Sequence, residues 1–272
     1  MKRLTEEQLN AYHNDGVLFP VPALGPGEAA EFLSWIDELE RAYGGSPKSY
    51  EISQCHLFFE WARRLVTHAA ILDAVEQIIG PNILVHATSI FQKRPYDGTY
   101  VSWHQDGYYM QLDRPDFVSA WVALTDSVPE NGCLRVVKRS HQTSRAHTDR
   151  AVADRNLLSS GLEIAVKVDE SEATEVVLRA GEMSFHHVNI VHGSNPNHSG
   201  LRRTGFAIRY VAPHVQQVSE HHPVLLVRGT DRYGNFHLHT DAALENFEQA
   251  VAAQRRFSTD LRARRQAAGR KG

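Results

Sequence analysis

The stretch WHQDGYY, residues 103–109, places a histidine and an aspartate two positions apart, at His104 and Asp106. Its β-branched and aromatic neighbours favour a strand, in which alternate side chains share a face. If that face is buried, the charge is costly unless it is paired or binds a metal. By itself the His-x-Asp spacing is a weak signal, because a surface pair near a strand end is the commoner case.

A third candidate ligand lies in the run MSFHHVNIVHGS, residues 183–194. We expect residues 182–192 to form one strand, so His186 has the same parity as His192. Only His192 directly precedes the Gly-Ser turn and stands eleven residues before Arg203. His192 is therefore the expected ligand, and His186 and His187 are expected to be structural or to lie behind the ligands.

The strand that follows Arg203 has two unlike faces. One face carries cations and small residues, which leave room for a bound anion, and the other is bulky and apolar, which suits packing against helices. The first face comprises Arg203, Gly205, Ala207 and Arg209, and the second comprises Phe206, Ile208 and Tyr210.

Two histidines and one carboxylate on one face of a metal match the facial triad of non-haem Fe(II) oxygenases, which leaves positions open for a co-substrate and O₂. An arginine grips a planar carboxylate through two parallel hydrogen bonds. Together these parts predict a 2-oxo acid co-substrate. The residues also leave open a cupin-like metal-binding isomerase or binding protein without oxidative chemistry.

The chain resembles the phytanoyl-CoA dioxygenase family of Fe(II)- and 2-oxoglutarate-dependent oxygenases, from about residue 8 to about residue 240. The resemblance is carried by motifs in the family's order and spacing. These are His104-Gln105-Asp106, Asn131-Gly132-Cys133-Leu134 leading to Ser140-His141, His192-Gly193-Ser194, and Arg203.

The resemblance implies a mainly β fold, a double-stranded β-helix core of the jelly-roll, cupin-like type with flanking helices. It implies Fe(II), 2-oxoglutarate and O₂ as cofactors. The implied iron ligands are His104, Asp106 and His192, and the implied 2-oxoglutarate contacts are Arg203, Ser194, Gln92 and Trp121. Some relatives are halogenases with a small residue in place of the carboxylate, so Asp106 argues for oxygenation.

The expected reaction is hydroxylation of an unactivated C–H bond, with release of succinate and CO₂, and the sequence leaves desaturation, epimerisation and ring formation open as other outcomes at the same iron. The segment LLVRGTDRYGNF, residues 225–236, is similar to the C-terminal part of members that tailor small molecules, so we expect a small metabolite of specialised metabolism as the substrate. Tyr108, Tyr109 and Arg209 are the expected substrate contacts, and a structural ion pair is the open alternative for Arg209.

The scaffold that positions these residues is predicted to be a single oxygenase domain over residues 1–272. Helical periodicity and capping signals predict N-terminal helices over about residues 5–80, the last of them running from about Trp61 to Ile79. Eight short β runs separated by turn formers predict the jelly-roll core over about residues 82–212. A C-terminal segment and helix are expected over about residues 213–272.

The bulk composition excludes several other classes of protein. The 272 residues are 42% hydrophobic and 22% charged, with a net charge of −3, which argues against nucleic acid or an anionic membrane as a partner. No apolar run is long enough to span a membrane, and the N-terminus is not a secretion signal. The two cysteines have no metal or redox spacing. We expect a cytoplasmic protein, and the sequence leaves its oligomeric state open.

Overall fold

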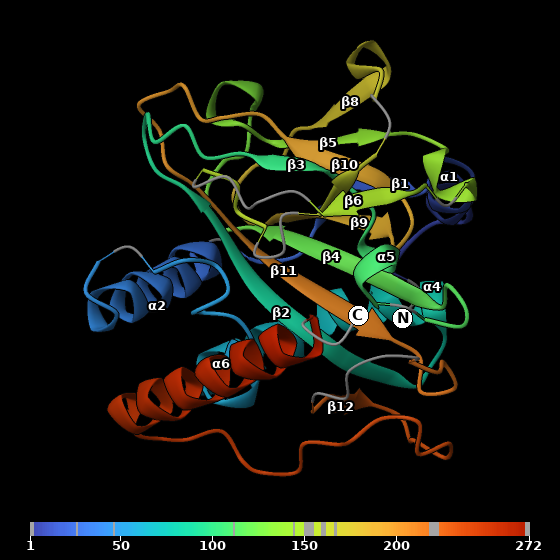
Figure 1. Ribbon diagram of the computed structural model, residues 1–272. Helices are drawn as coiled ribbons and strands as arrows, with labels where there is room; N and C mark the ends of the chain where they lie inside the picture. The colour runs from blue at the N-terminus through green and yellow to red at the C-terminus, as the bar shows by residue number, and fades with distance from the viewer. Residues whose placement is uncertain are drawn as a thin grey trace.

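Two antiparallel sheets face one another, with helices on the outer face of the larger sheet (Figure 1). The computed structural model describes residues 3–25, 27–45, 47–110, 112–143, 145–149, 155–158, 162–165, 168–217 and 223–269. The arrangement confirms the predicted jelly-roll core with flanking helices.

The larger sheet has six strands in the order β1-β9-β4-β11-β2-β12. Its strands are β1 (Val17–Pro22), β9 (Glu182–His187), β4 (Phe117–Ala123), β11 (Arg203–Val211), β2 (Ile83–Lys93) and β12 (Leu225–Arg228). The smaller sheet has the order β3-β10-β5-β8. Its strands are β3 (Val101–His104), β10 (Val191–Ser194), β5 (Leu134–Val137) and β8 (Ala173–Val176), and β6 (His147–Asp149) pairs separately with β7 (Leu162–Ile164).

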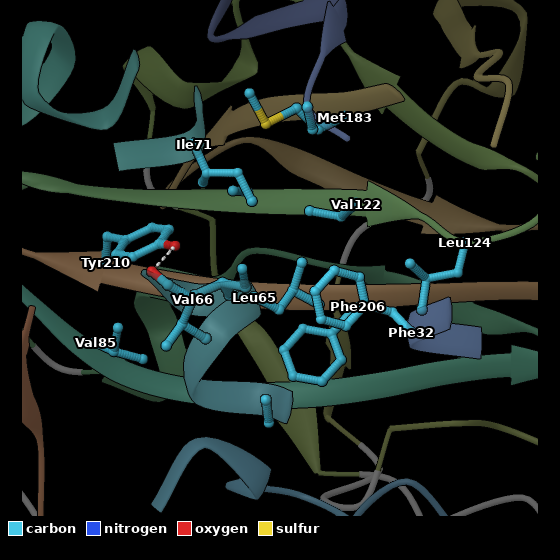
Figure 2. Close-up of a cluster of buried hydrophobic side chains, with 14 of the residues drawn as sticks. Phe32, Leu65, Val66, Ile71, Val85, Val122, Leu124, Met183, Phe206 and Tyr210 are labelled. Atoms are coloured by element: carbon cyan, nitrogen blue, oxygen red, sulfur yellow. Dashed lines mark hydrogen bonds between the residues drawn. The ribbon is translucent and has the colours of Figure 1, made fainter. Parts of the chain in front are cut away.

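The helices bury their apolar faces against the outer face of the larger sheet. They are α1 (Glu6–Asp15), α2 (Glu28–Ala42), α3 (Glu60–Val66), α4 (Ala69–Ile79) and α6 (Phe247–Gly269). Phe206 and Tyr210 of β11 pack with Phe32, Leu65 and Ile71 of the helices, as the apolar face of that strand predicted (Figure 2). Tyr210 also donates a hydrogen bond of 2.8 Å to the carbonyl of Val66, at the end of α3.

The opposite face of β11 looks into the space between the two sheets. Trp121 of β4 and Ala207 of β11 pack there against Leu134 and Val136 of β5. Each strand of the larger sheet thus separates the helix-packed core from the interior of the sandwich, and the candidate site lies in that interior.

Two predicted elements are wrong in detail, and one strand was not predicted. The helix expected over 61–79 is two helices, since Thr67 and His68 interrupt it and His68 has an extended backbone. The strand expected over 182–192 is also two, β9 and β10, and the chain crosses between them from one sheet to the other. The edge strand β1 was not predicted because its two prolines, which suit an edge, argue against a strand.

No helix in the described part of the chain is both long and apolar enough to cross a membrane.

Candidate metal centre and co-substrate pocket

His104, Asp106 and His192 come together between the sheets, all three buried. Each offers one donor atom, and these atoms lie within 4.8 Å of one another. The Asp106 Oδ1 atom is 3.5 Å from Nε2 of His104 and 4.0 Å from Nε2 of His192. Donors bonded at right angles to a metal at about 2.1 Å stand about 3 Å apart, so these atoms need to move inward only slightly. The described residues hold no second group of this kind.

Both histidines are fixed with Nε2 towards the common point. His104 Nδ1 lies 2.9 Å from the carbonyl of Ser102, and His192 Nδ1 lies 3.0 Å from the carbonyl of Ile190. A carbonyl only accepts, so each Nδ1 carries a hydrogen, and Nε2 is the ring nitrogen that faces the common point. This is the outer support that metal-binding histidines normally have.

Asp106 reaches the site by a route that strand parity did not predict. Strand β3 ends at His104, and Asp106 begins the short helix α5 (Asp106–Met110). Gly107 permits this turn, because a Cβ there would stand 2.1 Å from the Asn189 side-chain oxygen. The two ligands therefore converge because the chain turns after β3, while strand alternation alone does not bring them together.

The Asp106 carboxylate is ionised despite its burial. Burial raises the pKa of the carboxyl, but the Arg209 guanidinium and the His104 and His192 rings hold that pKa well below its usual range. Burial likewise keeps the pKa of His192 well below its ordinary value, so the ring is neutral and able to donate a lone pair. The protonation states are those that a divalent metal requires of its ligands.

Arg203 lies at the other end of the pocket, 2% exposed, with its Cζ atom 5.1 Å from the centre of the Trp121 ring. Burial lowers the pKa of its guanidinium to about 10, so it stays a cation at neutral pH. It donates no hydrogen bond to any residue that the structure describes, and its Nε atom is buried without a partner. The ring of Trp121 covers Gly205, where a Cβ would stand 1.9 Å from the indole.

Lys93 is a second buried basic group that sequence reasoning missed. Its Nζ atom donates to the Ser194 hydroxyl at 2.6 Å, to the Gly132 carbonyl at 3.1 Å and to the Asn195 carbonyl. Burial and the neighbouring Arg203 charge lower its pKa to about 6. Neither Arg203 nor Lys93 has a carboxylate partner within the described ranges. The signal that could have found Lys93 was its register, since Lys93 is paired directly with Arg203 across β2 and β11.

Between these ends lies a pocket lined by residues of both sheets. Its lining includes most of the predicted site residues and also His186, which was expected to lie behind the ligands. The lining residues are Phe91, Val101, His104, Ser119, Trp121, Leu134, His186, His192, Ser194, Arg203, Ala207 and Arg209.

Three predicted contacts are not among the lining residues. Gln92 is on the face of β2 opposite to Phe91 and Lys93, the face that carries Ile90 into the helix-packed core. Tyr108 is 43% exposed and stacks on His147 at 4.2 Å between ring centres. The side chain of Tyr109 lies outside the described part of the structure.

The chain matches one family model and is similar to proteins named as dioxygenases. The family model described as "Phytanoyl-CoA dioxygenase (PhyH)" matches residues 12–205. A probable alpha-ketoglutarate-dependent hypophosphite dioxygenase of Stutzerimonas stutzeri is 29% identical over 164 residues, 58% of this chain and 55% of that protein. An ectoine dioxygenase of Nocardia farcinica is 26% identical over 215 residues, 70% of this chain and 72% of that protein.

A solved structure covers nearly the whole chain. The non-heme monooxygenase ThoJ, in its apo form, is 35% identical with a TM-score of 0.80, over 95% of this chain and 96% of ThoJ. The same protein has also been solved as a nickel complex, with 33% identity, a TM-score of 0.76 and coverage of 96% and 99%.

Proposed function

Because the chain belongs to the phytanoyl-CoA dioxygenase family, we propose that it hydroxylates an unactivated C–H bond of a small metabolite, with release of succinate and CO₂. The enzyme class follows from the family and its relatives: the protein is a non-haem oxygenase that uses Fe(II), 2-oxoglutarate and O₂. The observation that carries the reaction is the convergence of three donor atoms in a pocket that Arg203 also lines, with its buried Nε lacking a hydrogen-bond partner among the described residues.

We assign the iron ligands to Nε2 of His104, Nε2 of His192 and one oxygen of Asp106. The donor set fits a ferrous ion, since imidazole and carboxylate suit non-haem iron and no thiolate is present in the group. The iron supplies the activation of O₂, which protein side chains cannot perform. The chain's own part is to present two imidazole nitrogens and one carboxylate, already buried and oriented.

The co-substrate contacts are proposed at the Arg203 end of the pocket. The far carboxylate of 2-oxoglutarate supplies the anion that Arg203 lacks, and Ser194 and Lys93 stand beside it. A buried cation without a counter-ion is costly, so binding of a carboxylate there removes a penalty that the protein alone carries. Trp121 closes one wall over Gly205 and keeps water from the ion pair.

The proposed substrate is a small molecule that approaches from the side of Arg209. Relatives named for ectoine and hypophosphite indicate that small molecules suit this scaffold. The Arg209 side chain is 11% exposed and lines the pocket, whereas Tyr108, which follows Asp106 in α5, is not among the lining residues. The intact carboxylate ligand supports oxygenation over halogenation.

Succinate formation tests this function directly. The protein, supplied with Fe(II), 2-oxoglutarate and O₂, is assayed for succinate while candidate metabolites are screened by mass spectrometry for products that gain one oxygen. We expect succinate to rise with a substrate and one oxygen to enter the product. Failure to form succinate with any compound would instead favour the cupin-like isomerase or binding protein.

A further inference from the structure

The second oxygen of Asp106, Oδ2, faces a row of side chains on the larger sheet. His186 of β9, Ser119 of β4 and Arg209 of β11 stand directly opposite one another across the three strands. All three point into the interior of the sandwich and line the pocket. The larger sheet therefore presents one polar row to the carboxylate, although Asp106 itself follows a strand of the smaller sheet.

Two members of the row hydrogen-bond to the same oxygen. The Ser119 hydroxyl donates to Oδ2 at 3.1 Å, and Arg209 Nε donates to it at 3.3 Å. His186 Nε2 stands 3.9 Å from Oδ2, beyond hydrogen-bond distance. An ionised carboxylate has about two lone-pair sites on each oxygen, so these two donors occupy both sites of Oδ2 and none of Oδ1.

Both donors are themselves fixed. Arg209 Nη1 donates a hydrogen bond of 3.1 Å to the Ser89 hydroxyl, which sets the plane of the guanidinium. Ser119 is 1% exposed in the middle of β4, between two paired strands. Oδ1, in contrast, is the oxygen that stands towards Nε2 of His104 and His192.

We propose that Ser119 and Arg209 are positioning residues that hold Oδ2 away from the iron, so that Asp106 binds through Oδ1 alone. The inference rests on the proposed function and deepens it. Three protein donors leave three positions of an octahedral ion, two for chelating 2-oxoglutarate and one for O₂. If Oδ2 also bound the metal, one of those positions would be lost.

The proposal predicts that the affinity for the metal and the affinity for 2-oxoglutarate respond differently when either positioning residue is replaced. Releasing Oδ2 adds a metal bond and removes an open position, so metal affinity is kept or raised while 2-oxoglutarate binds more weakly. A residue that only supports the fold of the site would lower both affinities together. We expect the affinity for 2-oxoglutarate to fall about tenfold or more, the range typical of groups that orient a metal ligand.

The experiment uses Ser119→Ala, Arg209→Met and a matched control, Ser184→Ala. Ser184 is buried on β9, on the same face as His186, and its hydroxyl has no hydrogen-bond partner in the part of the chain that the structure describes. Affinity for Mn(II) is measured by calorimetry, and 2-oxoglutarate affinity by the visible absorption band that its chelation gives to the Fe(II) protein without O₂. Thermal unfolding verifies that each variant is folded. Ser119→Ala changes no charge, so its effect separates hydrogen bonding from attraction between Arg209 and the co-substrate.

We expect Ser119→Ala and Arg209→Met to weaken 2-oxoglutarate binding without weakening Mn(II) binding, and Ser184→Ala to match the unmodified protein. The inference is overturned if Ser119→Ala behaves as Ser184→Ala does, or if both affinities fall in parallel. An unmodified protein that gives no absorption band with Fe(II) and 2-oxoglutarate would refute the proposed function itself, which keeps the two failures distinct.

Discussion

At the scale of single residues, Asp106 supplies the negative charge of the site, since it is the one anion among the three candidate ligands. Its burial would normally favour protonation, and the surrounding cation and rings reverse that preference. The anion is thus present before any metal arrives, and metal binding does not have to displace a proton from it.

Replacing Asp106 by alanine is expected to remove metal binding and lower succinate formation by more than about 100-fold, beyond the cost of losing an outer partner. Calorimetric titration with Mn(II) measures the first effect, and a coupled succinate assay measures the second. The control is Asp116→Ala, because Asp116 is half-exposed and pairs with His214 at the surface. Ordinary hydroxylation by the Asp106 variant would exclude it as a ligand.

Lys93 predicts a pH dependence of co-substrate binding. Burial and the Arg203 charge lower the Lys93 pKa to about 6, and a carboxylate placed beside it raises that pKa. Above pH 6 the complex therefore holds more protons than the free protein, so binding takes up protons and affinity falls as the pH rises.

Calorimetry at pH 8, in two buffers of different ionisation enthalpy, counts these protons. We expect uptake approaching one proton for the unmodified protein and close to none for Lys93→Met. Lys138→Met is the control, because Lys138 is an exposed lysine that pairs with Asp15. Equal proton uptake by all three proteins would show that Lys93 does not sense the co-substrate.

At the scale of elements, the helix layer and the pocket share the strands between them. In β11, Tyr210 anchors α3 on one face while Arg203 and Arg209 serve the pocket from the other. Loss of the Tyr210 hydroxyl leaves the buried carbonyl of Val66 without this donor, which costs about 1–3 kcal/mol.

Tyr210→Phe is therefore expected to lower the free energy of unfolding by that amount while the 2-oxoglutarate affinity stays unchanged. Denaturant titration and the Fe(II) absorption band measure the two quantities. Tyr12→Phe is a suitable comparison, since Tyr12 is buried at 3% exposure and its hydroxyl forms no hydrogen bond with the described residues. A Tyr210 variant as stable as the Tyr12 variant would contradict the anchoring role.

The elements also show why sequence reasoning succeeded in part. Alternation along β11 gave the correct faces, because that strand is regular across the pocket and is paired on both sides. Alternation failed at Asp106, where the chain turns at Gly107, and over 182–192, where the chain changes sheet with no proline or glycine at the break. Gln92 and Lys93 are adjacent, so only the register with β11 decides which of them faces inward.

The whole molecule gains stability from whatever the site binds. A ligand present at about 100 times its dissociation constant stabilises a folded protein by about 2.7 kcal/mol. For a protein somewhat larger than 250 residues, each kcal/mol raises the melting temperature by about 2–4 °C. The ligand pocket lies inside the sandwich, so this stabilisation applies to both sheets.

We expect chelator-treated protein to melt about 5–10 °C below protein supplied with Mn(II) and 2-oxoglutarate, as followed by circular dichroism. The Asp106→Ala variant provides the control, because it should show no such difference. Equal melting temperatures of the chelated and loaded unmodified protein would argue against a metal site between the sheets. The family model ends at residue 205, so a single oxygenase domain over residues 1–272 stays a prediction.

The division of the site between two sheets has a mechanical consequence. The histidine donors stand on β3 and β10, and the co-substrate clamp stands on β11 and β2. A dicarboxylic acid held by iron at one end and by Arg203 at the other would connect the two layers across their interior. Separation of the layers would then require release of the acid, and amide hydrogen exchange in β3 and β10 should slow each time the enzyme loads and recover once succinate leaves.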